Sequence, residues 1–404
     1  MAYTETEARE LVIEAGKRLL ETGLIARTWG NVSARISDTQ FVITPSGKPY
    51  DTLKPEELVK VNIADCSYDG DIKPSSEKGI HADAYKLRPD VNFVIHTHQV
   101  RASVVGATGL PIDSVPEVYK EVIGDCVPVA DYGMPSTDKL RKAVEAAYKE
   151  NPKCKAFMMI HHGAICLGKD LEESFKIAET LEVLCKEKIH KAYRLYEGTA
   201  KYSRKAMLES FIKANGGGKL PEYVIDFGDS VRNGNSFELT FKNGKTFTVD
   251  VKTAKSASED KLPAAAMIHA AIYKSSNITC IKHLTDNEIV GYSVIGQPIL
   301  PRLDDFAQIA GVKIKCVPWD GSMAGAKDIA KAVKGKNVVL VRGMGAVCTG
   351  TKQSDLEAVE LVLSKECQTQ MGALFFNSGD VLSPVDCGLM RTIYVTKYSK
   401  KAAE

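Results

Sequence analysis

The chain has 404 residues, of which 44% are hydrophobic and 26% charged, and its formal net charge is +2. This length suggests two or three domains with a sizeable core each, and the near-neutral charge offers neither a basic excess that would favour nucleic acid nor an acidic tail. The ten cysteines form no CxxC pair, so we expect reduced thiols rather than a disulfide framework, and small molecules or protein as partners.

The N-terminal segment is polar and then amphipathic, and it predicts a helix over about residues 5–22 that ends at Gly23. It lacks the basic start and the apolar stretch of a signal peptide. Nowhere do 18 apolar residues run together, so we expect no membrane span. These features together predict a cytoplasmic protein.

Two short loops come next, and both carry groups that suit an anion. The loop "TWGNVSAR" contains Gly30 and Asn31, and "ITPSGKPYD" contains Ser46 and Gly47. Such residues also mark ordinary turns, so each loop alone is a weak signal. Together with two serines further along, they would offer backbone N–H, amide and hydroxyl donors to one phosphate without a Walker or Rossmann glycine pattern. A small phosphorylated substrate follows as a hypothesis.

The next predicted helix starts near Ser75, which is a natural N-cap after Pro74, and continues through Tyr85. Its start contains "SSE", which places Ser76 and Glu77 where free backbone N–H groups bind anions. One interpretation of Glu77 is a first-turn carboxylate that the helix dipole favours. The other is an acid/base that exchanges a proton with a substrate carbon or hydroxyl beside a metal.

The run "VIHTH" at residues 94–98 is typical of a buried strand, and it places His96 and His98 on one face because side chains alternate along a strand. A later strand, "FMMIHHG", ends in His161 and His162, which point opposite ways so that one of them can face the pair. A single strand histidine is more often a core residue. Two imidazoles two residues apart, with a third from elsewhere, favour a divalent metal site.

A loose repeat relates the two halves of the chain. Two long segments, 80–98 and 157–187, recur as 268–284 and 339–366. The stretch "GLPIDSVPEVYKEVIG" matches "GQPILPRLDDFAQIAG", and "GNVS" has an echo in "GNSF". Because order and spacing agree, we predict two copies of one domain over residues 1–205 and 206–404, with "NGGGKLPE" as flexible chain near the join. Alternating β-rich and helical runs predict an α/β architecture in each copy.

The succession "GNVSAR", "ITPSG", "SSE…H…Y", "HTH" and "HHG" resembles the class II aldolase and adducin head-domain family, and within it the fuculose-phosphate aldolases most. The resemblance covers nearly all of residues 5–195. It implies tandem α/β/α domains, each around a largely antiparallel sheet, and a bound zinc or another divalent transition metal. The implied reaction is cleavage of a ketose 1-phosphate to dihydroxyacetone phosphate and an aldehyde.

The resemblance also implies a role for each motif. The residues are His96, His98 and His162 for the metal, Glu77 for acid/base chemistry and as an occasional fourth ligand, and Gly30, Asn31, Ser46, Gly47, Ser75 and Ser76 for the phosphate. The metal would stabilise the enediolate left after C–C cleavage, while Glu77 handles the proton on the dihydroxyacetone carbon. His161 would support the site. A tyrosine from a neighbouring subunit completes the family pattern, and "PEVYKEVIG" offers Tyr119 for it, although the alignment also allows Lys120.

The second copy departs from this pattern where the chemistry would lie. Ala265 stands in the place of the glutamate, Met344 in that of the third histidine, and at most His283 remains of the histidine pair. We therefore expect residues 206–404 to hold no catalytic metal and to serve in assembly or in shaping the first site.

Three other functions compete with the aldolase as interpretations of these residues. The family associates its sugar-phosphate 4-epimerases with Asp at the position of Glu77, so the glutamate favours the aldolase. A sugar-phosphate dehydratase would keep the same residues, and release of dihydroxyacetone phosphate would separate the two. An adducin-like scaffold would lack the ligands that the first copy retains. The aldehyde product and the sugar stereochemistry depend on loops and subunit contacts and are not predicted.

Members of this family form rings of four domains with sites at the domain interfaces. A tandem chain would build the same ring as a homo-oligomer of two chains, with intact and degenerate copies alternating. Each intact site would then adjoin a degenerate copy, in which Phe306 aligns with Tyr119 and lacks its hydroxyl.

Overall fold

The computed structural model describes residues 3–25, 29–256 and 261–398. Two seven-stranded sheets, each with helices packed against it, have the orders β3-β2-β1-β4-β7-β6-β5 and β10-β9-β8-β11-β14-β13-β12. Neighbouring strands are antiparallel except at β5–β6 and β12–β13. The predicted α/β fold with two largely antiparallel sheets is confirmed, and the identical strand order means that the halves are two copies of one topology. We call β1–β7 with α1–α6 the first copy, and β8–β14 with α7–α13 the second.

The strands are short, and most of those near the centre of each sheet are buried. In the first copy they are β1 (Asn31–Arg35), β2 (Gln40–Ile43), β3 (Val59–Asn62), β4 (Phe93–Thr97), β5 (Val129–Ala130), β6 (Ala156–Met159) and β7 (Ala164–Gly168). In the second they are β8 (Asp229–Asn233), β9 (Ser236–Thr240), β10 (Thr246–Asp250), β11 (Cys280–Leu284), β12 (Cys316–Val317), β13 (Val338–Val341) and β14 (Gly345–Gly350).

Helices connect and cover the strands. Those of the first copy are α1 (Glu5–Glu21), α2 (Lys78–Leu87), α3 (Val100–Gly106), α4 (Glu117–Ile123), α5 (Asp138–Glu150) and α6 (Leu171–Glu197), with a 3₁₀ turn at Pro55–Glu57. Those of the second copy are α7 (Arg204–Ala214), α8 (Ala266–Ser275), α9 (Asn287–Ile295), α10 (Asp304–Ala310), α11 (Met323–Val333), α12 (Gln353–Phe375) and α13 (Pro384–Ile393), followed by a π-helical turn at Tyr394–Tyr398.

Local sequence explains the bounds of the first two helices. Helix α1 begins after Thr4, whose side chain accepts from the backbone of Glu7 in a capping box, and the chain turns at Gly23 with φ +67°. Helix α2 begins at Lys78, later than the predicted start near Ser75, and the backbone N–H of Ser75 bonds to the Thr44 carbonyl of a different loop. Ser75 instead accepts the N–H of Glu77 through its hydroxyl.

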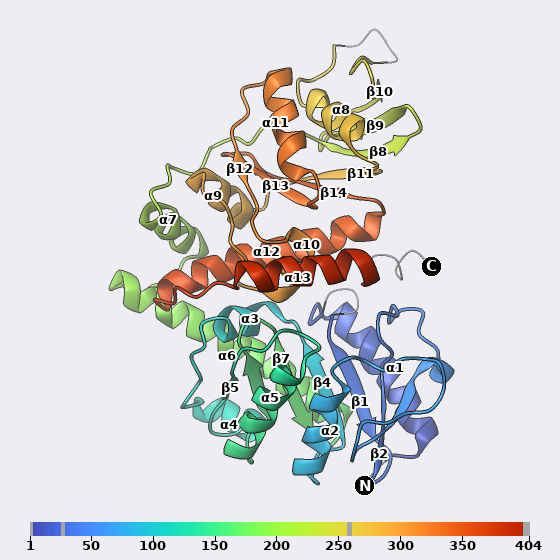
Figure 1. Cartoon of the computed structure of the whole chain (residues 1–404). Coiled ribbons are helices and arrows are strands. Elements are labelled where there is room, and N and C mark those ends of the chain that lie inside the picture. Colours follow the sequence, from blue (N-terminus) through green and yellow to red (C-terminus); the bar gives the residue numbers. More distant parts are fainter. Residues whose placement is uncertain (1–2, 26–28, 257–260, 399–404) are drawn as a thin grey trace.

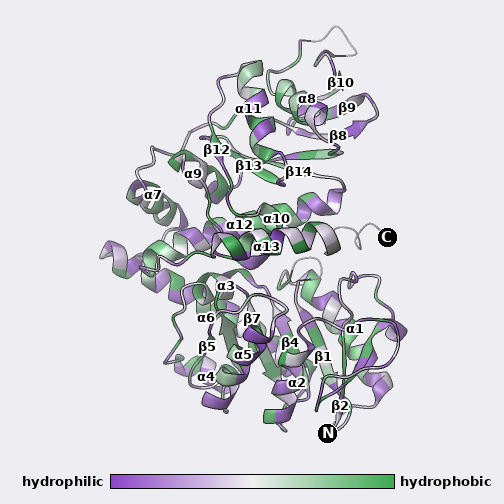
Figure 2. Cartoon of the chain, viewed as in Figure 1, coloured by the Kyte–Doolittle hydropathy of each residue, from purple (hydrophilic) through white to green (hydrophobic). Residues whose placement is uncertain are grey.

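Each sheet buries two apolar faces. In the first copy, α2 and α5 cover one face, and α1, α3 and α6 cover the other. The second face shares one continuous core cluster with α9, α10 and α12, so the two copies are packed together and not merely tethered. Figure 1 shows α10, α12 and α13 between the two sheets. In Figure 2 the strands β13 and β14 and helix α9 are mostly apolar.

The structure corrects one detail of the repeat. Ser33 of β1 pairs with Val94 of β4, and the equivalent pairing in the second copy joins Ser230 to Ile281. The match to "GNVS" is therefore the segment that ends in Ser230, whereas "GNSF" forms the turn between β8 and β9. The predicted boundary at residue 205 falls at the start of α7 and stays a prediction, and the predicted outer limits, residues 1 and 404, lie outside the described residues.

The described residues bear on two expectations, namely reduced cysteines and no membrane span. All ten cysteines carry free thiols. Over the ranges that the structure covers, no helix combines the length and the apolar character that crossing a bilayer requires.

Candidate metal centre

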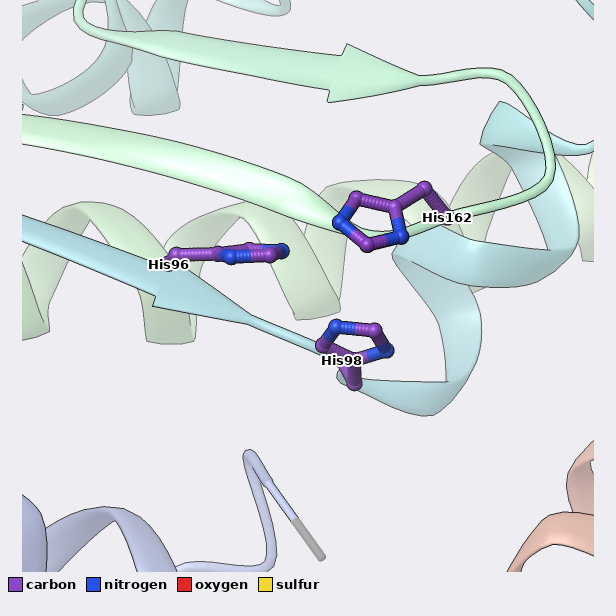
Figure 3. A group of neighbouring side chains, drawn as sticks. All are labelled: His96, His98 and His162. Atoms are coloured by element: carbon purple, nitrogen blue, oxygen red, sulfur yellow. The ribbon is translucent and has the colours of Figure 1, made fainter. Parts of the chain in front are cut away.

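Three histidines meet at one end of the first sheet. His96 lies on β4, His98 follows the end of that strand, and His162 lies in the turn between β6 and β7. The ring centroids of His96 and His162 are 4.7 Å apart, and each of these rings is 4.8 Å from that of His98. All three side chains are buried. Figure 3 shows the rings gathered around a common space, and we call this group the histidine cluster.

The backbone at His162 is shaped to reach this position. His161 adopts φ +63°, a conformation that a non-glycine residue rarely takes, and it turns the chain between β6 and β7. Gly163 follows, and a Cβ there would lie 2.2 Å from the carbonyl oxygen of Thr97 and 3.2 Å from Nε2 of His96. Only glycine therefore allows the turn to pass close enough to β4 to place His162 beside the pair.

The cluster leaves ring nitrogens without hydrogen-bond partners. His96 Nε2, His98 Nδ1 and His162 Nε2 are each buried and unpaired. Buried polar atoms are normally satisfied, so three such atoms within one group need an explanation. One ligand atom from each ring falls within 4.8 Å of those of the others. Three neutral imidazoles are a donor set that suits zinc and related divalent transition metals, so these residues fit a metal ion.

Glu77 reaches the cluster from the first position before α2. Its Oε2 lies 2.8 Å from His96 Nδ1, and its Oε1 lies 3.1 Å from His162 Nε2. Asn31 donates through Nδ2 to Glu77 Oε2 at 3.0 Å. Burial alone would raise the pKa of Glu77, but the facing charges of His162 and His96 hold it well below its usual range. Glu77 is therefore ionised and able to accept a proton.

His81 belongs to a different network. Its Nε2 bonds to Asn31, its Nδ1 lies 2.6 Å from Ser33 Oγ, and that hydroxyl lies 2.7 Å from Tyr85 Oη. Burial lowers the pKa of His81 to about 3, so the ring is neutral. The second copy repeats the network with Ser230, His269 and Tyr273, although it has no histidine cluster. The network is therefore a feature of the fold and not of the metal centre.

The residues expected at a phosphate lie close to Glu77. An isolated bridge between Pro45 and Pro74 places the loop with Ser46 and Gly47 beside Ser75 and Ser76. A small pocket opens next to them and is lined in part by Ser76, Glu77 and Ser136. Asn31 differs from them in that its side chain is bonded to Glu77 and His81 and thus belongs to the surroundings of the histidine cluster. Ser136, which bonds to Ser76 at 2.7 Å and was not predicted, is a further hydroxyl at this pocket.

Gly30, the remaining residue of that predicted set, packs against His96 of the histidine cluster. A Cβ at this position would lie 2.6 Å from the carbonyl oxygen of His96, and φ is +104°. Gly30 is thus the residue that lets its loop approach β4 at the cluster.

Tyr119 is not brought to the cluster of its own chain. It lies on α4, and its hydroxyl donates to Glu187 of α6 at 2.7 Å. The neighbouring Lys120 forms an ion pair with Glu117. A role of either residue in another chain stays a prediction.

Three residues of the second copy that were not predicted as site residues also reach the cluster. Asp304 accepts a hydrogen bond from His162 Nδ1, and Asp305 Oδ2 lies 3.4 Å from His98 Nδ1. Lys365 is fully buried and pairs with Asp305. The available signal was the pair of aspartates in "PRLDDF", which aligns with "SVPEVY" at the start of the surface helix α4.

The second copy has a different arrangement at the equivalent place. Both ring nitrogens of His283 are engaged by backbone: Nδ1 accepts from Phe227 N at 3.0 Å, and Nε2 donates to the Met344 carbonyl at 2.7 Å. Ala265 occupies the position before α8 that Glu77 occupies before α2. Among the residues described, both groups that could hold a metal include His98 of the first copy.

The chain matches the family model for the Class II Aldolase and Adducin N-terminal domain over residues 10–189 and 237–371. It is 31% identical over 178 residues to an L-fuculose phosphate aldolase of Haemophilus influenzae, covering 44% of this chain and 80% of that protein. It is 30% identical over 177 residues to a 5-deoxy-D-ribulose 1-phosphate aldolase of Bacillus thuringiensis serovar kurstaki, covering 43% and 80%. A solved L-fuculose 1-phosphate aldolase superposes with a TM-score of 0.43 at 29% identity, over 50% of this chain and 90% of that one.

Proposed function

The chain belongs to the class II aldolase and adducin N-terminal domain family, and from this membership and the histidine cluster we propose that it is a zinc-dependent aldolase. Its reaction would cleave a ketose 1-phosphate to dihydroxyacetone phosphate and an aldehyde. The printed activities of the two aldolases compared above, one on a fuculose phosphate and one on a deoxyribulose 1-phosphate, support a phosphorylated ketose as the substrate class. We also propose that the protein is located in the cytoplasm.

The observation that carries the proposal is the set of unpaired ring nitrogens beside an ionised carboxylate. His162 Nδ1–H donates to Asp304, and although burial opposes it, the charges of Asp304 and Glu77 raise the pKa of His162, so that without a metal Nε2 holds a proton 3.1 Å from Glu77 Oε1. A cation at the cluster would take the place of that proton beside Glu77 and would use the unpaired Nε2 of His96 as well. The described residues of the second copy offer no comparable set, so we propose one metal per chain.

The residues of the site would have separate roles in the reaction. A divalent metal held by His96, His98 and His162 would act as a Lewis acid that stabilises negative charge on substrate oxygens. Glu77 would exchange the proton at the dihydroxyacetone carbon through a carboxylate oxygen, and Asn31 keeps that carboxylate oriented by donating to Oε2. His161 supports the turn that presents His162.

The phosphate would be bound beside Glu77. Ser46, Gly47, Ser75 and Ser76 lie on two neighbouring segments next to Glu77, and the serine hydroxyls suit the chemistry that a phosphate requires. Gly30 and Asn31 would act at the boundary between the phosphate and the metal.

The test is a retro-aldol screen of ketose 1-phosphates with the zinc-loaded chain, in which dihydroxyacetone phosphate is detected by a coupled reduction. We expect release of this product from at least one substrate, and loss of the release in Glu77→Gln. Loss of water from the substrate with no dihydroxyacetone phosphate would identify a dehydratase, and interconversion of sugar phosphates would identify an epimerase. Either result would overturn the aldolase.

A further inference from the structure

Helix α10 of the second copy lies directly against the metal centre of the first. The backbone N–H of Asp304, at the start of α10, donates to the carbonyl oxygen of His161 at 3.0 Å. Gln308, one turn later, accepts from the indole N–H of Trp29 at 3.3 Å. Figure 1 shows α10 in the layer between the two sheets. The second copy thus touches the loops that carry His162 and Gly30.

Asp304 fixes the form of the His162 ring. Its carboxylate accepts the Nδ1–H of His162, and both side chains are buried. The hydrogen bond made by one ring nitrogen decides which nitrogen can give its lone pair to a metal, and here that nitrogen is Nε2 of His162. That nitrogen is the one that is unpaired and faces Glu77.

Asp305 and Lys365 hold the second ligand. Asp305 Oδ2 lies 3.4 Å from Nδ1 of His98, and its other oxygen, Oδ1, is buried and unpaired. Lys365 Nζ pairs with Asp305 and also donates to the backbone carbonyl of His98 at 3.3 Å. Buried charges persist when they are paired, and Lys365 supplies the positive charge that keeps a second aspartate beside the cluster.

The start of α10 is itself held in place. Glu366, next to Lys365 on α12, accepts the backbone N–H groups of Arg302 and Leu303 at 3.0 and 3.1 Å. Two consecutive residues of α12 therefore fix the backbone before α10 and the side chain of Asp305.

The aspartates are specific to the copy that covers the site. The positions of Asp304 and Asp305 correspond to Glu117 and Val118 on α4 of the first copy. Val118 is 76% exposed, and Glu117 pairs only with Lys120 on the surface. The same helix thus has buried acids where it meets a metal centre and none where it faces outward.

We propose that Asp304 and Asp305 are positioning residues of the metal centre, so that the second copy completes the site of the first within one chain. This inference rests on the proposed metal dependence. Neither residue is assigned contact with the substrate; each acts through a histidine ring. The expected effect of removing such a partner is a loss of metal affinity of about 10–100-fold.

The experiment measures metal binding by the full-length chain. Zinc affinity is determined by competition with a chromophoric chelator, and cobalt(II) absorption reports the geometry of the ligands. The variants are Asp304→Asn and Asp305→Asn, with Glu117→Gln as the matched control at the aligned position of α4. Thermal unfolding without metal identifies any variant that fails to fold, and the other aspartate variant then carries the test.

We expect both aspartate variants to bind zinc about 10–100-fold more weakly, with an altered cobalt spectrum, while Glu117→Gln matches the unsubstituted chain. Unchanged affinity and spectrum in both folded aspartate variants would overturn the inference while leaving the aldolase intact. Complete loss of metal in Asp305→Asn would also overturn it, because Asp305 would then be a ligand. Weakened metal binding in a chain that releases no dihydroxyacetone phosphate would support the inference and reject the aldolase.

Discussion

Glu77 combines burial, negative charge and contact with two ring ligands, and these three properties together suit an acid/base. Replacing it by Gln keeps the size and the hydrogen bond from Asn31 but removes the ability to take up a proton. We expect Glu77→Gln to retain most of its metal and to lose about 10²–10⁴-fold in turnover. Metal content by elemental analysis and initial rates on the same sample check this. Full activity would make Glu77 merely a carboxylate at a helix start.

His98 of the cluster and His283 of the second copy are both buried, but the ring nitrogens of His283 are occupied by backbone. By strand register His283 is the counterpart of His96, so it serves as the control for loss of a buried histidine outside the cluster. We expect one zinc per chain, weakened more than about 100-fold in His98→Ala, since even partners of ligands contribute about 10–100-fold. His283→Ala should keep its zinc. Two equivalents of comparable affinity, or no response to His98→Ala, would contradict a single centre in the first copy.

Glu366 is expected to make stability depend on pH. Burial raises its pKa to about 7 from the ordinary 4.5, although hydrogen bonds from Gln370 and Arg302 oppose this. Between these pH values the folded state holds more protons than the unfolded state, so its stability is full below pH 4.5 and falls as pH rises towards 7. The loss is on the order of 3 kcal/mol.

Urea unfolding of the metal-free chain between pH 5 and 8 checks this. The variant Glu366→Gln should lose less stability over that range than the unsubstituted chain, because it removes the titrating group. Equal pH dependence in the two chains would show that Glu366 is not the cause.

Sequence reasoning could find the histidine cluster but not its supports. His96 and His98 share a strand face, and the glycine after His162 marks a turn, so spacing alone brings these residues together. Asp304 is 142 residues away from His162 along the chain, and its contact depends on how two copies pack. No local periodicity encodes that packing.

The loop before β1 requires glycine at position 30. Gly30 has φ +104°, and an added Cβ would lie 2.6 Å from the carbonyl of His96, whereas Gly70 has φ +90° with nothing within 4 Å. We expect Gly70→Ala to cost about 1–2 kcal/mol, which is the strain of the backbone conformation alone. Gly30→Ala should cost more and should also weaken zinc binding, because His96 must shift. Thermal unfolding and the chelator competition measure both, and equal behaviour of the two variants would refute the close approach.

Helix boundaries were predicted well where capping is local and poorly where it is not. Helix α1 is bounded by its own Thr4 and Gly23. Helix α2 starts only at Lys78, and the segment before it is tied by a backbone bond from Ser75 to Thr44 of a different loop. The echo assigned to "GNSF" failed for a related reason, since strand pairing and not sequence likeness fixes which residues are equivalent.

At the scale of the whole molecule, the position of α10 bears on assembly. The second copy already covers the first-copy site, while the equivalent helix α4 leaves Val118 exposed. We propose a particle of two chains in which α4 meets the second copy of the partner, giving a ring with alternating copies. A mass measurement in solution should find two chains of 44.0 kDa each. A stable monomer would exclude the ring.

Substitution of Tyr119 tests which copies of the two chains contact each other in the particle. In the alternating ring it approaches a second copy, which carries no histidine cluster, so Tyr119→Phe should retain turnover within a few-fold of the unsubstituted chain. A loss of about 10²–10⁴-fold, as expected for a positioned proton donor, would mean that first copies contact each other directly.

The hydrogen bond between His162 and Asp304 joins two segments of a single polypeptide, and this determines how zinc affinity responds when the protein is diluted. A centre whose supporting groups come from a separate subunit weakens as that subunit dissociates, so its apparent metal affinity falls with protein concentration. Here the supporting carboxylates arrive by an intramolecular encounter, whose effective concentration is set by the covalent connection and not by the amount of protein in solution. Zinc affinity should therefore stay constant from micromolar to low nanomolar protein, even where a two-chain particle would come apart.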